Sequence, residues 1–222
     1  MEEPTRWQDE LIDRLVADAQ PVRRLWRPEV RLLVWLAVFA LVAVFVGGRF
    51  VRSDLELQLH SPLFLLEAAA MLVAGSLLGL EALRAAVPGH RHDRAVVWTI
   101  MATLAIVLLL LLRQPIHWGW TPDVFLKFGL LDLLHTAVLV AVPWVWLLVA
   151  LRRGAPLASG RSAALAGAAA FGLTFVVMRF CCRTDELMHL GVFHVLPVLV
   201  GTALSAGLGV LLLPRWRSAS AA

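Results

Sequence analysis

Charged side chains are scarce in this sequence. Asp, Glu, Lys and Arg make up only 16% of its 222 residues, whereas 60% are hydrophobic. Soluble globular domains are about one quarter charged. Several apolar runs reach the roughly 18–20 residues that a helix needs to cross a bilayer. The composition therefore argues against a soluble globular domain and indicates a protein embedded in the lipid bilayer.

Lysine and cysteine are also nearly absent. Lys127 is the only lysine, so the net charge of +4 comes from arginine. The arginines flank the apolar runs, which favours a role in membrane topology over direct nucleic-acid binding. Cys181 and Cys182 are adjacent, and adjacent residues reach disulfide geometry only under strain. We therefore expect no disulfide framework, and we see no cleavable signal peptide before the first apolar run.

Six apolar segments predict six transmembrane helices, because helices satisfy their own backbone groups in lipid. The predicted spans cover residues 31–48, 63–87, 95–112, 128–151, 162–180 and 190–213. The predicted fold is an all-α, polytopic membrane protein with a short N-terminal amphipathic helix. Residues 1–30 form a leader, residues 31–213 the six-helix transmembrane domain, and residues 214–222 a tail.

The distribution of arginine predicts the orientation in the membrane. If the N-terminus is cytoplasmic, most of the 20 basic residues fall in the leader, the tail and the two loops on the same side. The positive-inside rule then places both termini in the cytoplasm, and the even number of spans agrees.

Small residues and prolines indicate how the last spans pack. Small residues recur every four positions in the last two spans: Ala164, Ala168 and Gly172, then Gly201, Ser205 and Gly209. This spacing lets helix backbones approach closely in lipid. Pro143 and Pro197 are expected to kink the fourth and sixth spans, because each removes a backbone donor and crowds the preceding turn.

The leader predicts a short amphipathic helix. Thr5 and Gln8 have the spacing of a capping box, and Pro21 stops the helix. One apolar stripe contains Trp7, Leu11, Ile12, Leu15 and Val16. The opposite face is mainly acidic, which disfavours anionic lipid and favours a protein partner with a basic, grooved surface. The alternative is a leader that is packed on the protein or merely solvated.

Side chains that can bind metal gather on the predicted outer side. Asp132 and His135 are three residues apart and share a helix face, as do Glu186 and His189. Thiolate, imidazole and carboxylate groups together suit a soft or borderline divalent metal ion. The candidate ligands are Cys181, Cys182, Asp132, His135, His189 and His194. The alternative is a set of hydrogen-bonded polar residues at helix ends.

Two acidic residues inside spans need compensating partners. Asp132 lies in or near the fourth span, and His135, His194 or Arg179 are its candidate partners. Glu67 in the second span raises the same question. Glu81 and Arg84 read more simply as a pair at the inner end of that span.

Three segments, taken together, carry a family resemblance. They are "ELIDRLVADAQPVRRL" at 10–25, "LRRGAPL" at 151–157 and "CRTDELMHLGVFHVLPVLVGTALSAGLG" at 182–209. The sequence resembles the NrsF family of negative regulators of sigma-F. That resemblance implies an anti-sigma factor of the bacterial inner membrane. Its cytoplasmic N-terminal segment would hold an extracytoplasmic-function sigma factor, and its membrane part would receive a stress signal, metal ions or oxidant among them.

The chain departs from this family at one position. The family typically has a cysteine near the start of span four and another before span six. Cys182 matches the second, but Asp132 stands at the first. A mechanism based on two separated thiols therefore does not carry over, and a mixed site with a metal ion as signal is the expectation.

The same residues also fit other functions. A metal- or haem-binding carrier or oxidoreductase would use the outer histidines and cysteines, with His135 and His194 as paired haem ligands. A small transporter is less favoured, because the chain has no inverted repeat and few charges at mid-membrane depth. No nucleophile triad, phosphate loop, dinucleotide fingerprint or HExxH motif appears, so we expect no enzyme.

Overall fold

The computed structural model describes residues 6–17, 25–87, 89, 94–116, 122–154 and 156–213. The expectations for Thr5, Pro21 and the tail 214–222 lie outside these residues. Every regular element within them is helical, which confirms the predicted fold class. A short helix α1 (Arg6–Ala17) comes first, and α3 (Leu55–Leu59) is a single short turn between the first two spans.

Six helices are long and apolar enough to cross a membrane, and each overlaps one predicted span. The first is α2 (Pro28–Val42), continued by the π-helical turn η1 (Ala43–Gly47). The next four are α4 (Pro62–Ala85), α5 (Arg94–Leu111), α6 (Pro122–Arg152) and α7 (Ser159–Cys181). The last consists of α8 (Leu187–Leu190), the π-helical turn η2 (Gly191–Val195) and α9 (Leu196–Leu212).

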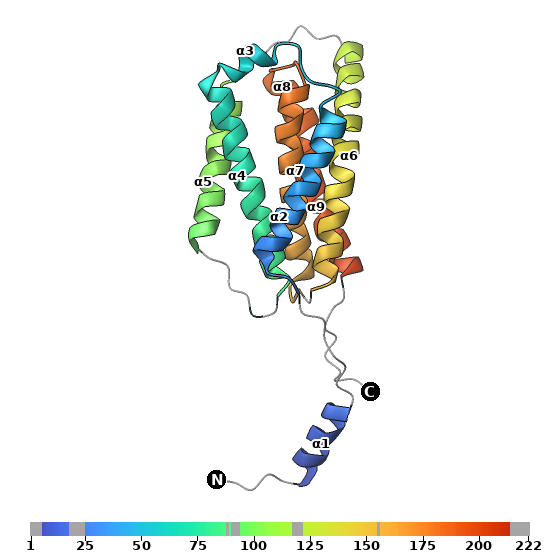
Figure 1. Cartoon of the computed structure of the whole chain (residues 1–222). Coiled ribbons are helices and arrows are strands. Elements are labelled where there is room, and N and C mark those ends of the chain that lie inside the picture. The colour runs from blue at the N-terminus through green and yellow to red at the C-terminus, as the bar shows by residue number, and fades with distance from the viewer. Residues whose placement is uncertain are drawn as a thin grey trace.

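Helix α7 forms the middle of the bundle (Figure 1). It packs against α4, α6 and α9. In the most apolar 18-residue stretch of this helix, 56% of the residues are buried inside the protein. Its buried positions are mostly small, which brings neighbouring backbones close. Helix α5 packs chiefly against α4 at the edge of the bundle. The protein interior is therefore organised around α7, whose C-terminal end carries Arg179 and the cysteines.

Helices α7 and α9 approach each other closely through the predicted face of α9. Gly201, Ser205 and Gly209 are all buried there. A Cβ added at Gly209 would lie 2.4 Å from the Cβ of Ala163, and one added at Gly167 would lie 2.2 Å from Ser205 Oγ. On α7 the contact with α9 is formed by Ala163 and Gly167, and of the predicted small residues Gly172 is buried and faces Met71 of α4. Ala164 and Ala168 are only half-buried.

The two prolines behave differently. Pro143 lies inside α6, which continues as an α-helix on both sides, and the Pro143 carbonyl accepts a hydrogen bond from Trp35 Nε1 at 3.0 Å. Pro197 lies in the first turn of α9, directly after the π-helical turn η2. The distortion expected at Pro197 therefore takes the form of a widened turn, which shapes the site described below.

Helix α1 lies apart from the six-helix bundle, beyond the end opposite to α3 (Figure 1). All five side chains of its predicted apolar stripe are exposed, from 47% for Leu11 to 69% for Val16. On the polar face, Arg14 and Glu10 form an ion pair at 2.8 Å. Among the described residues, no other element covers the apolar stripe of α1.

Candidate metal centre

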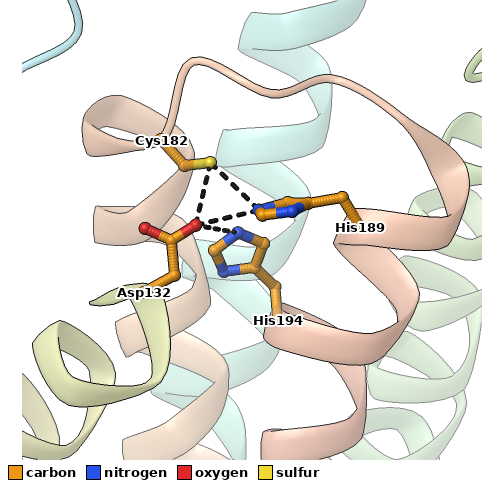
Figure 2. A group of neighbouring side chains, drawn as sticks. All are labelled: Asp132, Cys182, His189 and His194. Atoms are coloured by element: carbon orange, nitrogen blue, oxygen red, sulfur yellow. Dashed lines mark hydrogen bonds and ion pairs between the residues drawn. The ribbon is translucent and has the colours of Figure 1, made fainter. Parts of the chain in front are cut away.

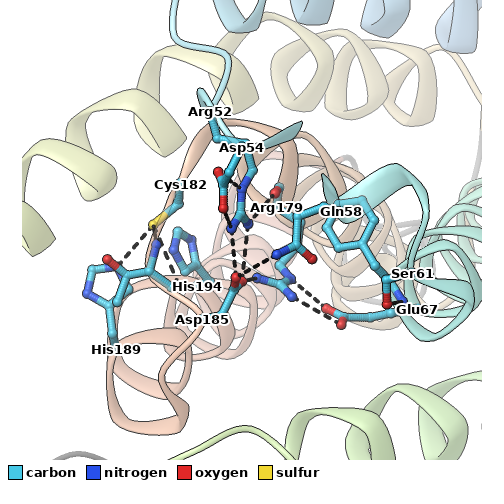
Figure 3. A network of polar contacts seen from close by, with 12 residues as sticks. Arg52, Asp54, Gln58, Ser61, Glu67, Arg179, Cys182, Asp185, His189 and His194 are labelled. Carbon is cyan, nitrogen blue, oxygen red and sulfur yellow. Dashed lines mark hydrogen bonds and ion pairs between the residues drawn. The ribbon is translucent and has the colours of Figure 1, made fainter. Parts of the chain in front are cut away.

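Buried polar groups gather at the end of the bundle where α3 lies, which we call the α3 end. The segment 182–186 links α7 to α8 there. Its backbone is held at both ends, because Cys182 N–H donates to the Met178 carbonyl and Leu187 N–H donates to the Pro115 carbonyl. The segment lies between two groups of side chains, and Figure 3 shows both of them.

The first group consists of Asp132 from α6, Cys182 from the 182–186 segment, His189 from α8 and His194 from η2 (Figure 2). We call it the four-residue cluster. Asp132 Oδ2 lies 2.8 Å from His189 Nε2 and 3.2 Å from Cys182 Sγ. Cys182 Sγ lies 3.4 Å from His189 Nε2. One potential ligand atom from each of the four residues lies within 4.8 Å of all the others.

The π-helical turn brings the two histidines together. In an α-helix, side chains five residues apart point about 140° apart around the helix axis. In that form His189 and His194 would face different sides of the helix. In η2, Leu196 N–H instead donates to the Gly191 carbonyl five residues earlier. The wider turn places the two imidazole centroids 5.4 Å apart. Such single π turns occur often at functional sites.

Burial keeps the cysteine of the cluster protonated. Burial, followed by the negative charge of Asp132, raises the pKa of the Cys182 thiol to about 12. The Thr184 N–H donates to Sγ at 3.4 Å and opposes this shift only in part. Because a metal ion binds the thiolate, binding must displace the thiol proton.

The surroundings of His194 indicate whether the cluster suits a metal ion. Its side chain is almost fully buried, with the residue 2% exposed, and neither ring nitrogen has a hydrogen-bond partner within the described parts of the chain. Its Nε2 lies 3.6 Å from Asp132 Oδ2, beyond ordinary hydrogen-bond length. A buried polar atom without a partner is costly. Two imidazoles, a thiolate and a carboxylate form a closed set of four ligands of the kind zinc prefers, so the residues fit a divalent ion.

Two predicted candidates lie outside the cluster. Cys181 is half-buried, and its thiol donates to the Gly47 carbonyl at 3.5 Å. The His135 ring lies against Phe50, with centroids 4.1 Å apart. Of the partners expected for Asp132, the structure supplies His194, and it adds His189 and Cys182. Since His135 packs on Phe50, the described structure does not pair it with His194 across a haem.

The second group is an ion-pair network that the sequence analysis did not predict (Figure 3). Arg52 follows η1, and its guanidinium donates hydrogen bonds to the carboxylates of Asp54 and Asp185, with nitrogen–oxygen distances of 2.7–3.1 Å. Arg179 from α7 also binds Asp185, and it binds Glu67 of α4 at 2.7 Å. Asp185 therefore lies between two arginines that come from different elements. In the sequence, Arg52 looks like an ordinary loop arginine, and no spacing rule connects it to a residue 133 positions away.

The arginines keep the carboxylates of Asp54 and Asp185 ionised. Burial alone would raise the pKa of Asp185, but hydrogen bonds from Arg52 and Arg179 outweigh it and hold the pKa below its usual value. The hydrogen bond from Arg52 lowers the pKa of Asp54 to about 2. The 182–186 segment is thus fixed by charge on one side and by the four-residue cluster on the other.

The fold and the site together define a helical, six-span membrane protein with a candidate metal centre at one end and an uncovered amphipathic helix beyond the other. Over residues 15–216 the chain matches the model of a family described as NrsF, negative regulator of sigma F. The chain therefore belongs to the NrsF family, which is a regulatory family and not an enzyme family. Comparison with curated proteins and with solved structures gives no significant match.

Proposed function

We propose that this protein is a membrane-bound anti-sigma factor that holds an extracytoplasmic-function sigma factor through residues 1–30. Residues 31–213 anchor it and receive the signal, and residues 214–222 form a cytoplasmic tail. The observation that carries the proposal is the exposed apolar stripe of α1 in a member of a family of sigma-factor regulators. A stripe of this size is unfavourable in water and favours a partner that covers it.

The chemistry of α1 indicates the kind of surface it binds. Trp7, Leu11, Ile12, Leu15 and Val16 would fill an apolar groove. Asp9, Glu10 and Asp13 lie on the other side of the helix and favour basic residues along the rim of that groove. Helix-in-groove binding of this kind relies on a few buried apolar anchors.

The arginines support an orientation with α1 and both termini in the cytoplasm. The start of α2, the ends of α4 and α6 and the start of α7 lie opposite to α3 (Figure 1), and these helix ends carry Arg27, Arg84, Arg152, Arg153 and Arg161. Basic residues are enriched on the cytoplasmic side. In this orientation the four-residue cluster faces the outside of the bacterial inner membrane. The signal would then arrive outside while the sigma factor is held inside.

We further propose that a divalent metal ion bound by the four-residue cluster is the signal. The cluster joins α6 to α8 and η2, so ion binding changes how these helices are held together. The ligand atoms of Asp132, His189 and His194 around the Cys182 thiol favour a metal ion over an oxidant as the signal, because together they can hold an ion that displaces the thiol proton. The ion shifts the protein toward the form that releases the sigma factor, by no more than its differential affinity for the two forms.

Charge placed on the apolar stripe tests the role of α1. The double substitution Leu11→Asp and Leu15→Asp is expected to abolish capture of the sigma factor, since each change buries an unpaired charge at the interface. The measurement is co-purification of candidate sigma factors with the full-length protein in detergent micelles, quantified by mass spectrometry.

The control places the same charge on the other face of the helix. Ala17 is exposed and lies among the acidic residues of α1, so Ala17→Asp is expected to leave capture close to wild type. Membrane insertion should be normal in both variants, because no span is changed. Wild-type capture by the double variant would show that α1 is not the binding element.

A further inference from the structure

The two histidines of the four-residue cluster meet only because the chain between them forms a π-helical turn. We infer that metal binding and the π turn are coupled: the ion favours the wide form of η2, and its loss lets this turn return to the α-helical form. The inference rests on the proposed metal site and adds how that site is regulated. It names an ion of the zinc class, because the ligand set is two imidazoles, one thiolate and one carboxylate in a closed group.

The π turn needs support from outside its own backbone. Turns with hydrogen bonds five residues apart are rare compared with α-helix. In an α-helical turn, His189 and His194 would point about 140° apart and could not share one ion. In the π form their rings lie 5.4 Å apart, and both nitrogens of the buried His194 have no hydrogen-bond partner within the described chain. An ion supplies the missing interaction in the π form only.

Pro197 supplies a second bias toward the π turn. In an α-helix, a proline ring crowds the carbonyl of the residue four positions earlier, which here is Phe193. Widening the turn before Pro197 moves that carbonyl away from the ring. The π-helical hydrogen bond from Leu196 N–H to the Gly191 carbonyl lies directly before the proline. The turn is therefore poised between two forms, and the ion adds to the bias of the proline.

The short helix α8 moves when the turn changes, because α9 is locked. A Cβ added at Gly201 or Gly209 would lie only 2.4–2.5 Å from atoms of α7, so α9 cannot rotate without losing this contact. Around Gly191, by contrast, a Cβ would meet no atom within 4 Å. When one π turn becomes α-helical, the helix on one side of the turn rotates about its axis relative to the helix on the other side. The rotation corresponds to one residue, or roughly 100°. That rotation falls on α8 and on the segment 182–186 in front of it, and it strains the contacts that the four-residue cluster and Asp185 make in the π form.

The ion-pair network carries this movement to the first span. Asp185 lies within the 182–186 segment and binds both Arg52 and Arg179. The backbone of Arg52 is also tied to α7, since its N–H donates to the Phe180 carbonyl at 3.0 Å. Arg52 follows η1, and η1 continues α2, whose other end adjoins the leader. A change at the cluster thereby reaches the span that begins next to the sigma-binding segment.

Coupling is reciprocal, so a change that favours the α form must weaken ion binding. Pro197→Ala removes the ring without changing any ligand, and it is expected to weaken zinc binding by roughly tenfold. Pro143→Ala removes a proline from α6 away from the cluster and is expected to bind zinc as wild type does. Isothermal titration of the full-length protein in detergent micelles with zinc chloride measures both affinities.

Amide hydrogen exchange gives a second readout that does not depend on a variant. Zinc is expected to slow exchange across residues 189–196 of the wild-type protein and to leave residues 201–209 unchanged. If wild type binds no zinc, the proposed metal site itself fails. If wild type binds zinc but Pro197→Ala binds equally well, or exchange at 189–196 does not respond to zinc, the coupling fails while the metal site stands.

Discussion

Glu67 and Arg179 form an ion pair in which each side chain is only 3% exposed. Removing such charges from water is costly, and the cost is offset only by close pairing and additional hydrogen bonds. Arg179 meets this condition by binding Glu67 through two nitrogens and Asp185 through a third. At the scale of single residues, the α3 end therefore combines buried ion pairs with a buried His194 whose two ring nitrogens have no hydrogen-bond partner within the described residues.

Substituting one buried and one exposed carboxylate should show how much the burial of an ion pair adds to the cost of losing it. Glu67→Ala leaves Arg179 buried with half of its partners and is expected to cost about 3 kcal/mol of stability. Glu29→Ala removes a carboxylate that is 57% exposed from Arg84, which keeps its pairing with Glu81, and should cost less than about 1 kcal/mol. Tryptophan fluorescence during thermal unfolding in detergent measures both. Equal losses would mean that the burial of Glu67 does not matter.

The cluster residues should matter for the response and not for the capture of the sigma factor. Cys182→Ser and Asp132→Asn each weaken one ligand, so both are expected to leave capture intact and to blunt the release caused by added zinc or cadmium ions. Cys181→Ser is the matched control, since the neighbouring thiol contacts Gly47 and lies outside the cluster. Release is measured as sigma factor lost from the immobilised protein. Wild-type release by both cluster variants would make the cluster structural only.

At the scale of helices, hydropathy alone was sufficient to locate all six spans, because crossing a bilayer requires long apolar runs. The close face of α9 also followed from the spacing of Gly201, Ser205 and Gly209. Periodicity failed where the helix is not an α-helix: in α-helical spacing His189 and His194 do not share a face, and η2 reverses that result. Pro197 was the available signal, but a proline predicts a distortion without specifying a π turn.

Two glycines of α9 offer a matched test of the contact with α7. A Cβ at Gly209 would lie 2.4 Å from Ala163 Cβ and 2.7 Å from the Ser159 carbonyl oxygen, whereas a Cβ at Gly207 would meet no atom within 4 Å. Gly209→Ala is expected to force the helices apart and to cost about 1–3 kcal/mol. Gly207→Ala should be neutral or slightly stabilising, because alanine favours helix. A thermal midpoint for Gly209→Ala equal to wild type would contradict the close contact.

At the scale of the whole molecule, the proposed signal site and the proposed sigma-binding helix lie at opposite ends of the bundle (Figure 1). The tertiary pairings that connect them could not be predicted from the sequence. Arg52 and Asp185 lie 133 positions apart in the chain. Long-range ion pairs have no periodic signature, so only the folded arrangement shows that α2 is tied to the segment beside the cluster.

The proposed division between an outer signal and an inner partner depends on the orientation of the bundle, which cysteine labelling can test. Ser53, near the α3 end, and Ala158, near the opposite end, are both exposed. In intact spheroplasts, a membrane-impermeant maleimide is expected to label Ser53→Cys at once and Ala158→Cys only after permeabilisation. Wild type reports background labelling, which should be low because Cys182 is buried and Cys181 is half-buried. The reverse pattern would place the cluster in the cytoplasm and α1 outside, where no sigma factor could reach it.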